Sequence, residues 1–172
     1  ACMLDQTAFA MPTAAAWAGQ LDPGFADNGK AWVHFTGSFG SRTTGLTVDH
    51  AGRILVAARI ETTEGSRFGL ARLNHDGSAD ASFGHHGYVI GSFERGFEAT
   101  AGKVMELPDG RILLSGLHYE NTDRTLPAIA LFDQQGRAVQ SFASAGRQVI
   151  RLCGSLSQGL RDTWLPPGVP GL

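Results

Sequence analysis

Three copies of one short stretch set the architecture of this chain. The central copy, ADASFGHHG, occupies residues 79–87, an earlier copy, LDPGFADNG, occupies 21–29, and a shorter one, VQSFASAG, lies at 139–146. The phenylalanines of the three copies stand 58 and 59 residues apart, and their last glycines keep the same spacing. A fixed period marked by an aromatic residue and a turn glycine indicates a repeat architecture.

Each repeat has room for four short strands. In the first repeat we expect them at residues 30–36, 43–49, 53–60 and 67–73, with a glycine-bearing hairpin at 50–52. The third is a continuous apolar run, as in a strand buried on both faces. Leucine-rich and ankyrin repeats are shorter and partly helical. We therefore predict an all-β fold of β-propeller-like blades, each of four antiparallel strands, with about two and a half to three blades per chain.

The repeats divide the chain into four parts. Residues 1–20 form an N-terminal segment that is a candidate blade-completing strand, 21–78 form repeat 1, 79–138 form repeat 2, and 139–172 form an incomplete repeat 3. The second repeat follows the first closely, since GRIL at 110–113 answers GRIL at 52–55.

The residues that recur with the period have a structural interpretation. We expect the phenylalanines to fill the junctions between blades, where each would bury on the order of 150–250 Å². We expect the glycines to form turns that need a positive φ. The set is Asp22, Phe25, Gly29, Gly52, Gly77, Asp80, Phe83, Gly87, Gly110, Gly136, Phe142 and Gly146.

The composition is that of a soluble globular protein and favours neither a nucleic acid nor a membrane as partner. Hydrophobic residues make up 42%, charged residues 17%, and the formal net charge is −2, so no basic groove is expected. The longest apolar run, residues 54–58, is far too short to span a bilayer. The alanine-rich stretch 8–18 lacks the basic residues that precede a signal sequence. A cytoplasmic location is the default expectation, and export is the alternative.

Several stretches imitate ligand sites, and each has a plainer interpretation. Residues 24–31 nearly match a phosphate-binding loop, but the other copies replace Lys30, so the match is a coincidence. The loop at 74–80 spaces oxygens like a calcium site but lacks the downstream glutamate, which favours a turn. The adjacent histidines at 85–86 have no third ligand. Cys2 and Cys153 fit no zinc or redox spacing and are expected as free thiols. We assign no catalytic residue, no cofactor and no metal.

The repeated pattern resembles the bacterial delta-sixty repeat. The likeness covers residues 21–152 and is carried by the motif at 21–29, by GRIL at 52–55 and by FGLARLNHDG at 68–77. There are departures: the turn at 49–52 lacks the usual aspartate before glycine, Leu131 replaces the arginine of the first copy, and the third copy loses its Leu-Asp pair. The resemblance implies propeller-like β repeats, often in surface or exported bacterial proteins, and no agreed catalytic activity.

Three hypotheses of function follow. The first is a non-enzymatic binding or assembly module for a glycan or protein ligand, because every conspicuous motif recurs with the repeat. The second is a hydrolase or lyase whose site is built from non-repeating loop residues at a propeller mouth. The third is a fragment of a longer propeller protein. Candidate residues for the hydrolase or lyase site are His34, Glu94, His118 and Glu120, with Glu61, Glu64 and Glu98 as further carboxylates. Candidate residues for a binding surface are the non-repeating tryptophans Trp17, Trp32 and Trp164.

Ring closure gives the most specific expectation. Propellers have four to eight blades, and two complete repeats and half of a third leave edges and apolar faces that need cover. We expect a homodimer that closes a ring of about six blades. Residues 8–17 would supply a strand to the unfinished repeat of the partner and bring Cys2 of one chain near Cys153 of the other.

Overall fold

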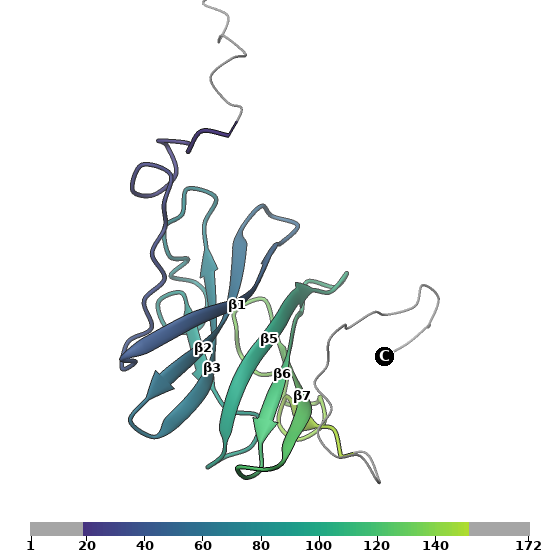
Figure 1. Ribbon diagram of the computed structural model, residues 1–172. Coiled ribbons are helices and arrows are strands. Elements are labelled where there is room, and N and C mark those ends of the chain that lie inside the picture. Colours follow the sequence, from purple (N-terminus) through teal and green to yellow (C-terminus); the bar gives the residue numbers. More distant parts are fainter. Residues whose placement is uncertain (1–18, 152–172) are drawn as a thin grey trace, which may run out of the picture.

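The computed structural model describes residues 19–151, which form two antiparallel sheets of four strands each (Figure 1). The strands are β1 Gly40–Val48, β2 Ile54–Thr62, β3 Gly65–Leu73, β4 Tyr88–Gly91, β5 Glu98–Glu106, β6 Ile112–Tyr119, β7 Thr125–Phe132 and β8 Arg147–Val149. We call β1–β4 blade 1 and β5–β8 blade 2. The expected all-β fold of four-stranded blades is confirmed, and residues 19–151 contain no helix. No helix in this part of the chain could therefore cross a membrane.

Several sequence-based expectations fall on other residues. The strand proposed at residues 8–17, the two cysteines, Trp17, Trp164 and most of the incomplete third repeat lie outside the described residues.

The sequence period and the blades are out of phase. The motif at residues 79–87 connects β3 to β4 inside blade 1, and the one at 139–146 connects β7 to β8 inside blade 2. Each motif turns the chain so that a short fourth strand returns antiparallel to the third. A blade therefore takes three strands from one repeat and its fourth strand from the next.

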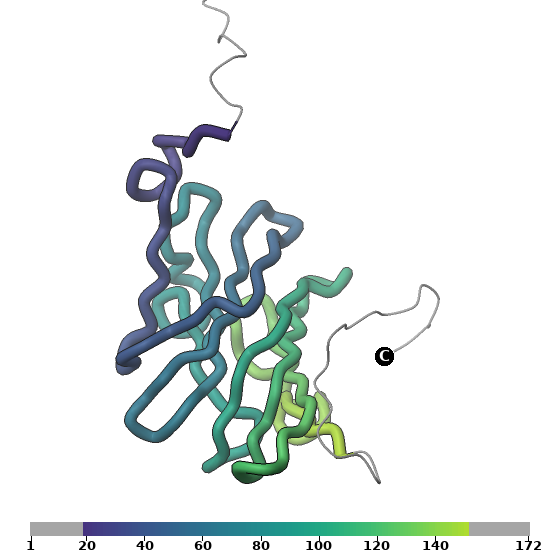
Figure 2. Tube along the Cα trace, viewed as in Figure 1, coloured from purple at the N-terminus to yellow at the C-terminus, as the bar shows by residue number. Residues whose placement is uncertain are grey.

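This phase explains why the strand expected at residues 30–36 is absent. That segment corresponds to β4 of blade 1, and no strand among residues 19–151 pairs with residues 31–35. Its side chains still alternate as in a strand, with Ala31, Val33 and Phe35 more buried than Trp32 and His34. Figure 2 shows this segment, coloured dark blue, passing along blade 1 on the side away from blade 2.

Phe35 anchors this segment on blade 1. It is fully buried in a small core with Val56, Ala58, Ile60 and Ala71. A β-carbon at Gly69 would lie 2.7 Å from the Phe35 ring, so the ring rests directly on the glycine backbone of β3. The segment thus covers part of one face of blade 1.

The larger core lies between the two blades. Leu55, Phe68 and Leu70 of blade 1 pack with Leu114 and Phe132 of blade 2, among others. The inner strands also approach closely, since a β-carbon at Gly45 would lie 2.7 Å from the carbonyl oxygen of Gly102. The blades stack face to face, as in a propeller.

The repeated phenylalanines contact the turn of the following blade. Phe83 is fully buried, and a β-carbon at Gly136 would lie 2.8 Å from its ring. The neighbouring Gly84 N–H donates to the carbonyl of Gln135 over 2.7 Å. Phe25 meets the Gly77 turn of blade 1 in the same way. The motif at residues 79–87 therefore joins blade 1 to blade 2.

A buried ion pair strengthens the junction between the blades. Arg72 Nε lies 2.7 Å from Asp80 Oδ2, and Arg72 Nη1 donates to the carbonyl of Gln134 in blade 2. The guanidinium carbon stands 4.6 Å from the centre of the Phe83 ring. Burial tends to raise the pKa of Asp80, but hydrogen bonds from Ser82 and Arg72 outweigh it and hold the pKa below its ordinary value.

Blade 2 lacks both members of this pair. Leu131 stands where blade 1 has Arg72, and Val139 stands where it has Asp80. A lone buried charge costs far more than a matched apolar pair, which explains why the two positions differ together.

The turn at 49–52, which lacks the aspartate before its glycine, has the same local contacts as the corresponding turn at 107–110 in blade 2. In blade 2, Asp109 accepts from the Arg111 N–H and pairs with its Nε over 2.7 Å. In blade 1, Asp49 does the same for Arg53 from four residues earlier, also at 2.7 Å. Asp49 therefore holds Arg53 in blade 1 as Asp109 holds Arg111 in blade 2.

Candidate functional site

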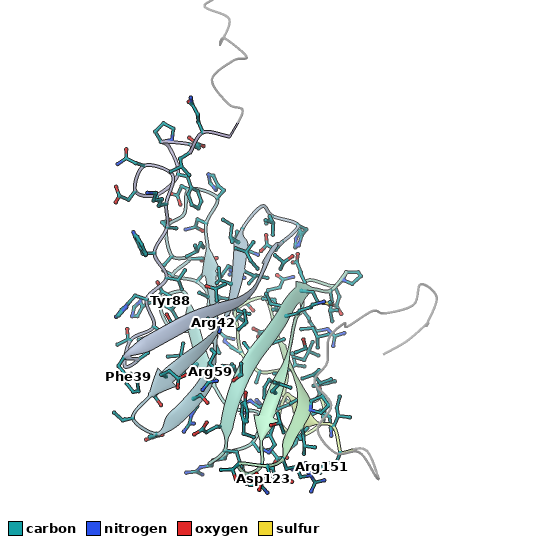
Figure 3. The ribbon with its side chains drawn as sticks, in the orientation of Figure 1. Phe39, Arg42, Arg59, Tyr88, Asp123 and Arg151 are labelled. Carbon is teal, nitrogen blue, oxygen red and sulfur yellow. The ribbon has the colours of Figure 1, made fainter. Side chains whose placement is uncertain are left out.

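A group of charged side chains gathers at one end of blade 2. The β4–β5 connection, the β6–β7 hairpin and the chain leaving β8 all lie at this end, because consecutive antiparallel strands alternate in direction. They contribute Glu94, Glu120 and Arg151, and His118 lies just inside, near the end of β6. We call these four residues the loop-end cluster. Figure 3 labels Asp123 of the hairpin and Arg151 close together in this region.

Arg151 holds the carboxylates together. Its Nη1 and Nη2 donate to Glu94 Oε1 and Oε2 over 2.8 and 2.9 Å, a two-bond contact of guanidinium with carboxylate. Nη2 also lies 3.5 Å from Glu120 Oε1, while Arg124 pairs with Glu120 Oε2 at 2.9 Å. These hydrogen bonds from Arg151 hold the pKa of Glu94 below its ordinary value. The Glu94 carboxylate is therefore ionised at neutral pH, and both of its oxygens accept hydrogen bonds from Arg151.

His118 is the unusual member of the cluster. Its side chain has 0% exposure, and neither ring nitrogen has a hydrogen-bond partner among the described residues. Nε2 lies 3.6 Å from Glu94 Oε2, and the Phe97 ring packs edge-on at 5.0 Å. Burial lowers the pKa of His118, and the Glu94 carboxylate opposes this only in part. The imidazole is therefore neutral at pH 7.

The positions that correspond to the loop-end cluster in the preceding repeat hold uncharged residues. One repeat earlier, His118 corresponds to Ile60, which is fully buried in the core. The other three members correspond to the uncharged Thr36, Thr62 and Ser92. All four positions of the cluster therefore depart from the preceding repeat.

The site expected from the sequence is partly assembled. Glu94, His118 and Glu120 come together, whereas His34 lies exposed on the segment along blade 1. The His118–Glu94 distance exceeds hydrogen-bond reach, and the histidine is shielded from solvent. Arg151 was missed, although aligning the repeats reveals it as an arginine in a serine position.

The other candidate residues have structural partners or lie in loops. Glu61 pairs with Arg59 at 2.7 Å, Glu98 accepts from Ser66 Oγ over 2.8 Å, and Glu64 pairs with Arg67 at 3.4 Å. The loop at 74–80 is a turn in which Asp76 accepts from the backbone and hydroxyl of Ser78. His85 and His86 are exposed, with ring centres 4.5 Å apart. No three His, Cys, Asp or Glu residues within 19–151 gather closely enough to hold a metal.

A second candidate site is an apolar surface on blade 1. Leu46 and Val48 of β1 are 62% and 58% exposed, on the side away from blade 2. Trp32, on the segment that runs along this blade, is 83% exposed. We call the surface formed by Trp32, Leu46 and Val48 the free face; the buried core of Phe35 and Val56 lies behind it. Figure 3 labels Tyr88 of β4, which packs against the core behind this face.

Comparison with known proteins supports the architecture. A family model described as a domain of unknown function (DUF5122) beta-propeller matches residues 52–83, from β2 through β3 into the second motif. No curated protein and no solved structure matches the chain. The matched family supports a β-propeller repeat.

Proposed function

We propose that the chain is a non-enzymatic propeller module that assembles with a second copy of itself, and that its repeat is of the delta-sixty type. The periods of 58 and 59 residues support the repeat type. One observation carries the assembly. Leu46 is 62% exposed, whereas Val104, its counterpart one repeat later, is 6% exposed because blade 1 covers it.

The free face repeats the covered face of blade 2 along its length. Val56 corresponds to Leu114, Ala58 to Gly116 and Ala71 to Ala130. In blade 2, Leu114 and Ala130 belong to the core between the blades, and Gly116 lies against Phe93 of the same core. A surface with this pattern is suited to receive a blade. Large exposed apolar side chains such as Leu46 favour a partner in the same way.

The opposite side of blade 2 has the features of that partner. Leu113 and Ile129 stand where blade 1 has Leu55 and Leu70, the residues with which blade 1 packs on blade 2. Leu131 adds an apolar side chain where blade 1 has a charged one. A second copy that brings this side of blade 2 to the free face continues the stacking. Two such contacts close a ring of four of the described blades, fewer than the six expected from the sequence.

Light scattering tests the assembly. We expect a dimer for the full chain and a monomer for Leu46→Glu, which places a charge in the centre of the contact. Thr63→Glu, on the exposed β2–β3 hairpin, is the matched control and should remain dimeric. A wild-type chain that is folded and monomeric at all concentrations would contradict the proposal.

The convergence of Glu94, His118 and Glu120 favours a second function, a hydrolase or lyase. An unbiased hydrolase screen of the wild type and His118→Ile tests it, and equal activity in the two proteins would exclude a role for the histidine. A glycan array run in parallel tests for a carbohydrate ligand. The reading frame around the gene tests whether the chain is a fragment of a longer propeller.

A further inference from the structure

His118 is placed where an imidazole is unfavourable. One ring nitrogen always carries a hydrogen, and burying that donor without an acceptor costs free energy. Ile60 fills the same position in blade 1 without this cost. A residue that reduces stability where an apolar one fits has a role other than packing. Because histidine changes charge near neutral pH, a proton is the simplest ligand for it.

The Glu94 carboxylate lies between the charged guanidinium of Arg151 and the neutral imidazole of His118. Its Oε2 accepts from Arg151 Nη2 at 2.9 Å and faces His118 Nε2 at 3.6 Å. A shift of less than about 1 Å would bring Oε2 within the 2.7–2.9 Å range of a charge-assisted hydrogen bond to a protonated imidazole. The same shift takes Oε2 away from Arg151.

We propose that His118, Glu94 and Arg151 form an acid-operated latch. When His118 takes up a proton, Glu94 Oε2 moves from Arg151 to the imidazolium, and the two-bond hold of Glu94 on Arg151 is reduced to one bond. The new positive charge also repels the guanidinium. The chain that leaves β8 through Arg151 is thereby loosened from the β4–β5 connection and the β6–β7 hairpin.

The groups around His118 determine the pH at which the latch loosens. Glu94 faces it from the β4–β5 connection, Glu120 from the end of β6, and Arg151 from the chain after β8. The paired residues on β5 and β7 are the uncharged Ala99 and Leu126. Because burial lowers the pKa of His118, the latch stays closed at pH 7 and loosens only below the ordinary histidine pKa of about 6.5.

Proton titration by NMR tests the latch. The ring signals of His118 and the side-chain NH signals of Arg151 are followed from pH 8 to pH 4 in the full chain. Both should change with one midpoint. Arg151→Gln removes a repulsive charge and frees Glu94, so it should raise the proton affinity of His118 several-fold. Glu94→Gln should lower it several-fold. Arg137→Gln, which removes an equal charge from an exposed turn, should leave it unchanged.

A purely structural role would give a different result. If His118 does not titrate in this range, or if its midpoint is the same in wild type, Arg151→Gln and Glu94→Gln, the latch is refuted. An Arg151 signal that is insensitive to pH while His118 titrates would equally refute it. In His118→Ile, which places the residue of blade 1 at this site, the pH response of Arg151 should disappear.

Discussion

We expect the contact between the blades to depend strongly on the side chain of Phe83. It is fully buried, its ring stacks on the Gly136 turn of blade 2, and the Arg72 guanidinium lies over it. Replacing a fully packed phenylalanine by alanine typically costs about 3–5 kcal/mol. Loss of the cation–π contact adds about 1 kcal/mol. We therefore expect Phe83→Ala to lower the free energy of unfolding by at least about 4 kcal/mol.

The matched control is Phe39→Ala, which removes the same atoms from a side chain that is 76% exposed. Its cost should stay within about 0.5 kcal/mol. Denaturant unfolding, followed by circular dichroism at one protein concentration, measures both. Equal losses in the two variants would refute the view that the repeated phenylalanine joins the blades.

Further predictions concern the buried ion pair, a glycine and the histidine. Arg72→Leu should cost about 3 kcal/mol, because it leaves the Asp80 carboxylate buried without its main partner. Adding Asp80→Val should recover at least half of that loss, as the apolar pair of blade 2 indicates, and additive losses would contradict the coupling. Gly69→Ala should cost about 1–3 kcal/mol by displacing Phe35, and it should increase the tryptic cleavage of that segment; unchanged cleavage would argue against the anchor. His118→Ile should raise stability at pH 7 by about 1 kcal/mol or more. The wild type should lose stability as the pH falls below about 6.5, because the unfolded chain binds the histidine proton more tightly, and the His118→Ile variant should lack that loss.

The repeat alone predicted the four-stranded blades, because the period of the phenylalanines and glycines records a structural unit directly. It did not predict where a blade begins. A periodic sequence has no phase of its own, so the motif could separate blades or lie within one. The strand expected at residues 30–36 is absent for the same reason. A fourth strand forms only beside the third strand of its own blade.

The loop-end cluster was predictable in part. Glu94, His118 and Glu120 were recognised as residues that do not repeat, and the structure brings them together. His34 shares that property, but it sits on the segment over blade 1, and only the three-dimensional arrangement separates it from the others. The burial of His118 without a hydrogen-bond partner among residues 19–151 has no signature in the sequence.

The contact between copies can be tested directly with cysteine cross-linking. Within the chain, the strands β1 and β5 of the two blades approach closely at Gly45 and Gly102. One repeat along, the same approach between two copies would bring Lys103 of one chain next to Thr44 of the other. Chains carrying Lys103→Cys are mixed with chains carrying Thr44→Cys, with both native cysteines replaced by serine. The account predicts a disulfide-linked dimer in the mixture and none in either protein alone. Two folded proteins that never cross-link when mixed would contradict it.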